Sequence, residues 1–338
     1  MMNKMPLILL LLCLPLLVWS QKKHAVVTYA ADKFKVQVYN SSWEKENDIV
    51  VNIEQLEGSP TAENYHTTGA LRSTYITSDG SKMYFSLYHL PAESETDSIK
   101  WTALFMYEFA TRKISRILEL PLTMFVPWEL NEARNTILLY DYNEGWIKEI
   151  SLNSMKSKRL FPATLHSGNY QLISDSSSCS FIYVYHDSIY KTDYHFLSEQ
   201  SKSSVLFNYP DYSGYRKGNL LVYSLPGKGN LTYLITPLRR HIKSIPRTND
   251  YAAWKDDNHL YITEENALCL YNLKLEMVKS FYVEQPFVLQ TLENELLIAY
   301  TKNKERRFAI VDSNLTTLTE LPEVYDNFIQ LVTTFTQP

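Results

Sequence analysis

The residues with the most obvious chemical potential are two acidic pairs and one glycine-rich turn. Asp256-Asp257 and Glu264-Glu265 offer carboxylates of the kind that bind calcium, but the spacing of an EF-hand loop is missing. Gly227-Lys228-Gly229 is the nearest approach to a phosphate loop, and it lacks a strand–loop–helix context. Serine-hydrolase, zinc-protease, P-loop and dinucleotide motifs are absent from the sequence. We therefore expect no catalytic residue, metal site or cofactor, and interpret these groups as exposed turns.

A second kind of chemistry is the stacking of tyrosine rings on a ligand. The segment Asn208–Tyr215 reads NYPDYSGY and places three tyrosines around one acid. Tyrosine faces with polar neighbours suit sugar rings or peptide groups. The candidate ligand-binding residues, which also include three cations from other segments, are Arg72, His166, Tyr209, Asp211, Tyr212, Tyr215 and Arg247. The alternative is that these tyrosines pack beneath a long loop.

These candidates lie far apart in the chain, so only a repeating architecture could bring them together. The clearest repeat is Thr74–Leu120, where short apolar strands alternate with turns and form one four-stranded antiparallel meander. Weaker copies fill the rest of the chain on both sides of it, and the second strands of the repeats recur every ~36 to 54 residues. A lone meander cannot bury both faces, so the copies must stack around an axis.

The pattern predicts an all-β fold, a single β-propeller of four-stranded blades. We count seven blades, with six or eight as alternatives, and keep a pair of β-sandwiches as the competing architecture. Closure requires one blade to be completed from the other terminus, and either the tail Asn327–Phe335 or the first strand His24–Ala30 suits that role. The loops that join an outer strand to the next inner strand would then ring the channel mouth and carry the candidate residues.

Thr77–Phe85 (TSDGSKMYF) resembles the S-x-D-G-x-x-apolar-Y-F signature of TolB-type and WD-repeat-like propellers. Degenerate copies begin at Lys255 and at Ser174, although most repeats lack the glycine and the proline usual before Asp79 is missing. The resemblance implies that the Asp-Gly turn joins the innermost strand to the next. The chain is also similar to exported propellers with no assigned activity, and the resemblance implies no catalytic residues.

The first twenty residues predict export. Lys4 precedes the leucine-rich stretch Pro6–Val18, which is too short to span a bilayer of ~30 Å, and cleavage before Gln21 would leave residues 21–338 as the propeller domain. A lipoprotein signal at Cys13 is disfavoured because Leu12 stands where a small residue is needed. We therefore expect a secreted or periplasmic protein with no membrane span after processing.

The composition of the chain argues against some classes of function and leaves others open. The 338 residues carry a net charge of -4, which argues against nucleic acid as a partner. Cys179 and Cys269 could form a disulfide after export, but we interpret them as two separate buried residues. The leading hypothesis is a non-enzymatic propeller that binds a protein, peptide or glycan on one face. The alternatives are a polymer-acting lyase or hydrolase at the channel mouth, with Asp211, His166 and Arg247 as its candidates, and a structural envelope component.

Overall fold

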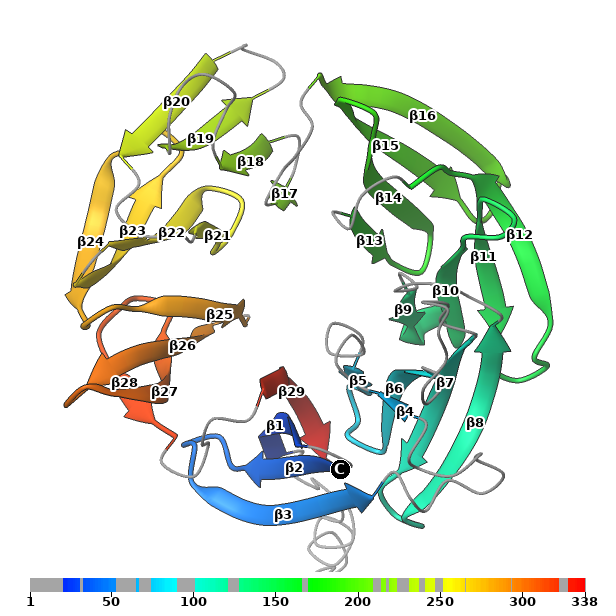
Figure 1. Cartoon of the computed structure of the whole chain (residues 1–338), viewed down its shortest axis with the longest axis horizontal. Helices are drawn as coiled ribbons and strands as arrows, with labels where there is room; N and C mark the ends of the chain where they lie inside the picture. The colour runs from blue at the N-terminus through cyan, green and yellow to red at the C-terminus, as the bar shows by residue number, and fades with distance from the viewer. Residues whose placement is uncertain are drawn as a thin grey trace, which may run out of the picture.

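The protein is described from a computed structural model. The parts of the chain that the structure describes are residues 21–30, 33–52, 65–66, 74–89, 101–120, 128–165, 170–208, 214–216, 219–223, 231–236, 241–246, 252–264, 266–292, 294–321 and 328–337. They form β-sheets arranged radially around one axis (Figure 1), which is the propeller architecture and not a pair of packed sandwiches. Their only helical element is the short 3-10 turn η4 (Glu132–Arg134).

One blade joins the two ends of the described chain, and we call it the closing blade. It contains, from the axis outwards, β29 (Phe328–Gln337), β1 (Gln21–Ala30), β2 (Lys33–Tyr39) and β3 (Lys45–Asn52). The tail strand β29 pairs antiparallel with β1, with Val26 opposite Val332. This confirms that the tail closes the ring, and it removes an otherwise exposed sheet edge on β1.

Five further four-stranded blades follow the same order from the innermost strand outwards. They are β9 (Trp128–Asn131), β10 (Thr136–Asp141), β11 (Trp146–Ser151) and β12 (Ser157–Pro162); β13 (Tyr170–Ser174), β14 (Ser178–Tyr185), β15 (Ser188–His195) and β16 (Gln200–Phe207); β17 (Gly214–Arg216), β18 (Asn219–Tyr223), β19 (Leu231–Thr236) and β20 (His241–Pro246); β21 (Ala252–Trp254), β22 (His259–Glu264), β23 (Ala267–Asn272) and β24 (Met277–Tyr282); and β25 (Phe287–Thr291), β26 (Glu295–Lys302), β27 (Glu305–Asp312) and β28 (Leu318–Glu320). The middle strands are apolar on both faces, as in the wholly buried β10 (TILLYD), because neighbouring blades cover both sides.

The remaining sheet has five strands and stands between the closing blade and the β9–β12 blade (Figure 1). Its strands are β4 (Tyr65–His66), β5 (Thr74–Ile76), β6 (Lys82–His89), β7 (Trp101–Glu108) and β8 (Lys113–Leu120). Both β4 and β5 pair with β6, at its two ends. Two short strands therefore share the innermost position of this five-stranded sheet.

The prediction of seven four-stranded blades is wrong, because the described residues form six such blades and one five-stranded sheet. The physical reason is the length of β6, whose eight residues exceed what the three residues of β5 can pair. Its far end, Tyr88 and His89, is paired by Tyr65 and His66, which lie in a segment that the sequence predicted to be only a connection.

The hydrophobic core lies between the sheets. One cluster joins the closing blade to the five-stranded sheet through Val36, Phe85, Phe105 and Phe335. The two cysteines are free and buried, 1% exposed each, in agreement with the interpretation as separate core residues. Among the described residues there is no helix with the length and apolar character that crossing a bilayer requires.

Candidate functional site

The predicted ligand mouth falls almost entirely outside the described residues. Tyr215 is the exception, since it lies in β17 and its backbone pairs with Leu220 of β18. The six candidates that lie outside the described residues are Arg72, His166, Tyr209, Asp211, Tyr212 and Arg247. The structure therefore neither brings these side chains together nor separates them.

The strands around those candidates have the connectivity that the prediction requires. In sequence, residues 163–169 join the outermost β12 to the innermost β13, residues 208–213 join β16 to β17, and residues 247–251 join β20 to β21. The innermost strands also contact one another around the ring, as β9 contacts β13 and β21 contacts both β17 and β25. We call the end of the ring where the innermost strands begin the loop end, and the opposite end, where they turn into the second strands, the turn end.

The turn end is held by aspartate-centred turns, as the resemblance implied. Asp79 Oδ1 accepts hydrogen bonds from Ser81 N at 2.9 Å and from Thr77 Oγ1 at 2.6 Å. Asp175 Oδ1 accepts from the backbone N of Ser177 at 2.7 Å, and Asp256 Oδ1 from that of Asn258 at 2.7 Å. These bonds favour the ionised carboxylate, and hydrogen bonding lowers the pKa of Asp79 and of Asp175.

A carboxylate crosses from the β9–β12 blade to the five-stranded sheet at this end. Glu132, in η4, accepts hydrogen bonds from Ser78 Oγ at 2.7 Å, from Ser78 N at 2.9 Å and from Tyr75 Oη at 2.9 Å. The hydroxyl of Tyr75 is held in its neutral form, because burial and the bond to Glu132 raise its pKa well above its ordinary value. Glu132 thus fixes the Asp-Gly turn of one sheet against the next blade.

A second carboxylate crosses from the β9–β12 blade to the β13–β16 blade. Glu129 Oε1 accepts from Ser174 N at 3.1 Å and from Ser174 Oγ at 3.2 Å. Its Oε2 is buried with no hydrogen-bond partner among the described residues, and burial raises the pKa of Glu129 to about 7. Asn131 of the same strand donates to the carbonyl of Asp175 at 2.7 Å. This junction is polar and contains a group that titrates near neutrality.

The closing blade has a different titratable group. His24, 2% exposed, stacks on Trp43 with ring centroids 4.1 Å apart, and its Nδ1 lies 3.0 Å from Thr334 Oγ1 of the tail strand. Trp43 Nε1 donates to Glu295 of β26 at 2.9 Å. Burial lowers the pKa of His24, an effect that Glu295 opposes. The imidazole therefore stays neutral where the closing blade, the tail strand and the β25–β28 blade meet.

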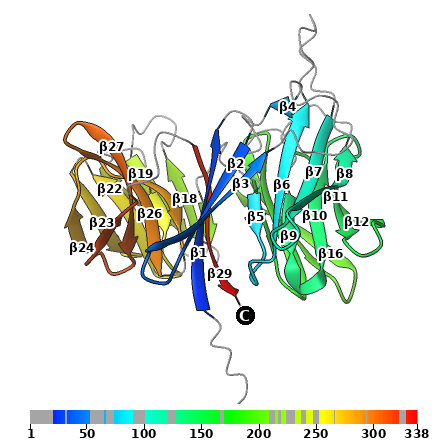
Figure 2. The same ribbon diagram turned by 90° about the horizontal axis from the view of Figure 1, so that it is seen from below.

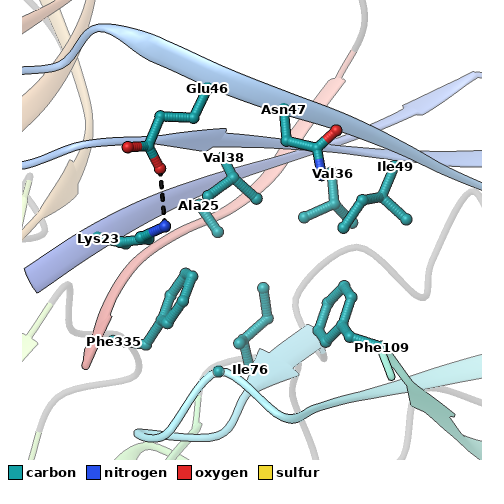
Figure 3. Close-up of a pocket in the computed structure, with 11 residues that line it drawn as sticks. Lys23, Ala25, Val36, Val38, Glu46, Asn47, Ile49, Ile76, Phe109 and Phe335 are labelled. Atoms are coloured by element: carbon teal, nitrogen blue, oxygen red, sulfur yellow. Dashed lines mark ion pairs between the residues drawn. The ribbon is translucent and has the colours of Figure 1, made fainter. Parts of the chain in front are cut away.

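A crevice of about 370 Å³ opens between the closing blade and the five-stranded sheet at the turn end. Its rim carries an ion pair between Lys23 and Glu46 at 2.9 Å, with Asn47 beside it (Figure 3). Apolar side chains from both sheets line the interior: Ala25, Val36, Val38, Ile49, Ile76, Phe109 and Phe335. This crevice joins a largely apolar interior to a rim that has both a cation and an anion.

Gly80 allows the tail strand to close against this crevice. Its φ of +68° suits glycine, and a Cβ atom placed there would overlap the ring of Phe335. The backbone of Thr336 donates to the carbonyl of Ser78 at 2.8 Å, which fixes the end of β29 to the same turn. The Asp-Gly turn therefore has a role in ring closure as well as in its own hairpin.

The acidic pairs agree with the prediction of exposed turns only in part, because Asp256 and Asp257 lie in a turn but are half-buried, and Glu264 is the last residue of β22. Asp256 bonds within its own turn and to His259 Nδ1 at 2.9 Å, and Asp257 pairs with Arg216 of β17 at 2.8 Å. Glu264 accepts from Tyr271 Oη at 2.9 Å, whereas Glu265 lies outside the described residues. In the described part of the chain, no three carboxylate, histidine or cysteine side chains gather as a metal site would require.

Sequence reasoning missed the residues that the structure makes prominent, which are Glu129, Glu132 and the Lys23–Glu46 pair. The first two lie in the segment Trp128–Arg134 (WELNEAR), where the acids alternate with apolar residues. The apolar run Met124–Trp128 favours an inner strand just before them, which would leave both acids in a loop. The structure instead has β9 at Trp128–Asn131, and residues 124–127 lie outside the described residues.

Comparison with known proteins supports the fold. No family model and no curated protein matches the chain. Among solved structures, a prolyl endopeptidase matches with a TM-score of 0.55 and 12% identity, over 94% of this chain and 50% of that one. The β-propeller domain of the Trilobed protease from Pyrococcus furiosus, reported to have an open velcro topology, matches with a TM-score of 0.52 and 15% identity, over 90% and 95% of the two chains.

These likenesses confirm the predicted resemblance to β-propellers at the level of fold. TolB from Acinetobacter baumannii is also similar, with 10% identity over 93% of this chain and 82% of that one, but its TM-score of 0.40 is too low to carry an argument. This chain spans half the length of the prolyl endopeptidase chain, so that enzyme's activity does not transfer with the fold. Unlike an open velcro propeller, this ring is closed by β29 pairing with β1.

Proposed function

We propose that this protein is an exported, non-enzymatic propeller that binds a protein, peptide or glycan through the loop end of the ring. The observation that supports the proposal is the strand order, in which the segments carrying the candidate residues lead into the innermost strands of four different sheets, β5, β13, β17 and β21. The proposed binding residues are Arg72, His166, Tyr209, Asp211, Tyr212, Tyr215 and Arg247. In an antiparallel blade, these connections meet at one end of the axis.

The chemistry follows from the residue types. Tyrosine rings present a flat apolar face with a polar tip, so they stack on sugar rings or peptide planes and still bind water or a partner at the hydroxyl. Arginine and histidine add donors for the acetamido, hydroxyl or carbonyl groups of such ligands. A rigid ring that holds these side chains in place reduces the entropy lost on binding.

Export is part of the same proposal. β1 begins at Gln21, so cleavage before this residue leaves intact the pairing of β1 with both β2 and β29. The expected product is a mature chain without residues 1–20. N-terminal sequencing of the exported protein tests this, and a first residue within the leader, or a lipidated Cys13, would contradict it.

Binding is tested with arrays of glycans and peptides probed with residues 21–338. We expect a defined set of ligands to be retained, and we expect a Tyr209→Ala/Tyr212→Ala variant to lose about tenfold in affinity with an unchanged melting temperature. Tyr282→Ala is the matched control, because this tyrosine is 79% exposed on the outermost strand β24. Equal losses in both variants would contradict the proposal. Shortened products from a bound polymer would favour a lyase or hydrolase instead.

A further inference from the structure

The crevice between the closing blade and the five-stranded sheet has the features of a second binding site, independent of the loop end. Its volume of about 370 Å³ is at the small end of ligand pockets, which span roughly 300–1,000 Å³. That space suits one large side chain and the groups beside it, and it is too small for a folded domain. The occupant is therefore a short extended segment or a small molecule.

A β-bulge aims polar groups into the crevice. The pairing of β2 with β3 shifts between Val38 and Tyr39, so that Val38 faces Asn47, Tyr39 faces Lys45, and Glu46 is the extra residue. Alternation alone would put Asn47 and Ile49 on one face of β3 and Glu46 on the other. The bulge places Glu46 on the crevice side with Asn47 and Ile49 (Figure 3).

The ion pair at the rim indicates which kind of ligand the crevice can bind. Lys23 Nζ is already neutralised by Glu46 at 2.9 Å, and the Lys23 side chain is only 19% exposed, so a free carboxylate would have to break a shielded pair. A neutral group that both donates and accepts meets the pair without displacing it, since it can donate to Glu46 and accept from Lys23 or Asn47. The peptide group has this property.

The interior completes the argument. Ala25 and Val36 are fully buried, Ile76 is 4% exposed and Phe335 7% exposed, so the floor is apolar and comes from four strands that the fold holds together. A sugar would bring more hydroxyl groups than this lining can satisfy. We infer that the crevice between the closing blade and the five-stranded sheet binds an extended peptide of a partner protein, with one large apolar side chain inserted and its flanking peptide groups bonded to Lys23, Glu46 and Asn47.

The inference is tested with the mature chain carrying labelled isoleucine methyl groups. Acetyl-Gly-Phe-Gly-amide should shift the signals of Ile49 and Ile76, which line the crevice, and leave unchanged the buried Ile182 of β14, two sheets away from the crevice. Acetyl-Gly-Ala-Gly-amide should bind about tenfold more weakly, because it buries far less apolar surface. Sodium octanoate serves as the probe for an acyl anion.

Two substitutions on one strand provide the matched variants. Asn47→Trp fills the rim of the crevice and should abolish the shifts caused by the phenylalanine peptide. Val50→Trp adds the same ring at a side chain that is 51% exposed on β3 and does not line the crevice, and it should leave binding within about twofold. The Tyr209→Ala/Tyr212→Ala variant should also bind normally, which keeps this test separate from that of the loop end.

Three results would overturn the inference. One is the absence of any shift at Ile49 and Ile76 with the phenylalanine peptide. Another is a response to octanoate and not to the peptide, which would assign the crevice to acyl anions. The third is equal loss of binding in Asn47→Trp and Val50→Trp with melting temperatures unchanged, which would place the peptide elsewhere.

Discussion

The two sides of the five-stranded sheet are joined to their neighbours by different means. Towards the β9–β12 blade, Glu132 accepts hydrogen bonds from Tyr75 and from the backbone and hydroxyl of Ser78. Towards the closing blade, contact depends on apolar packing around Phe335, with one backbone bond from Thr336 to Ser78. The second junction contains the crevice, whose polar groups stand at its rim.

The difference shows that one propeller can hold neighbouring sheets together either by a few hydrogen-bonded atoms or by apolar packing. A carboxylate that accepts several hydrogen bonds fixes both position and orientation, so that junction is specified by a few atoms. Apolar packing specifies shape less tightly and leaves room where side chains do not interdigitate. Figure 2 shows that the end of β29 and the beginning of β1 lie together at the turn end, so the closing junction is also where the two ends of the described chain meet.

The largest expected effect is at the apolar junction. Gly80→Ala should destabilise the protein by about 3 kcal/mol or more, because the new methyl group overlaps Phe335 and the φ of +68° is unfavourable for alanine. Gly145→Ala is the matched control, with a φ of +69° but its nearest neighbour, the Ala163 carbonyl, at 3.4 Å, and should cost about 1 kcal/mol. Urea unfolding measures both, and equal costs would show that overlap with the tail strand is unimportant.

The next effect is at the polar junction. Glu132→Ala removes the acceptor of Tyr75 and Ser78 and should lower the free energy of unfolding by about 2 kcal/mol. Glu305→Ala, which removes only an exposed ion pair with Arg307, should change it by less than about 0.5 kcal/mol. A Glu132→Ala variant as stable as the control would mean that the carboxylate does not hold the two sheets together.

The blades next to these junctions should also differ in their response to pH. The pKa of Glu129 is raised from 4.5 to about 7, so the folded state binds its proton more tightly than the unfolded state does. Its contribution to stability is complete below pH 4.5 and is lost as pH rises through 7, a loss of about 3 kcal/mol at ~1.4 kcal/mol per pKa unit. Glu129→Gln should abolish this loss, as measured by unfolding at pH 5 and pH 8.

His24 should change the stability of the protein with pH in the direction opposite to Glu129. Burial lowers its pKa from 6.5, so its contribution is present above pH 6.5 and is lost as pH falls through the lower folded-state pKa. His24→Gln should therefore reduce the loss of stability on acidification, in the same unfolding experiments and by less than the change at Glu129. A wild-type stability that is flat from pH 5 to pH 8, with both variants also flat, would contradict both assignments.

The sequence predicted the features that depend on local pattern. The turn at Asp79 was predicted because Asp-Gly between alternating strands has few other conformations, and ring closure by a terminal strand was predicted with the tail as one of two candidates. The five-stranded sheet could not be predicted, because Tyr65 and His66 form a strand only through pairing with the far end of β6. The β-propensity of these two residues does not depend on the distant strand with which they pair, so it could not indicate the pairing.

The candidate sites likewise differ in how much of each could be predicted from the sequence. Tyrosines around an acid are visible in the sequence, but the sequence assigned Tyr215 to the loop, whereas the structure places it in the innermost strand β17. The crevice was invisible, because it needs both the local bulge at Glu46 and the approach of Phe335 to Gly80, which stands at the other end of the chain. Glu129 was missed because its environment is set by the neighbouring blade. Ser174 of that blade donates to Oε1, whereas Oε2 is buried without a partner among the described residues.

The central claim is that ligands dock at the loop end of the ring, and hydrogen–deuterium exchange tests it most directly. The mature chain is compared alone and with the strongest array ligand whose binding the Asn47→Trp substitution leaves unchanged, which separates loop-end ligands from a peptide in the crevice beside Gly80. We predict slower exchange in residues 208–216, with residues 77–81 at the turn end unchanged. Protection of residues 77–81 with no change in residues 208–216 would contradict the claim and place the ligand at the opposite end.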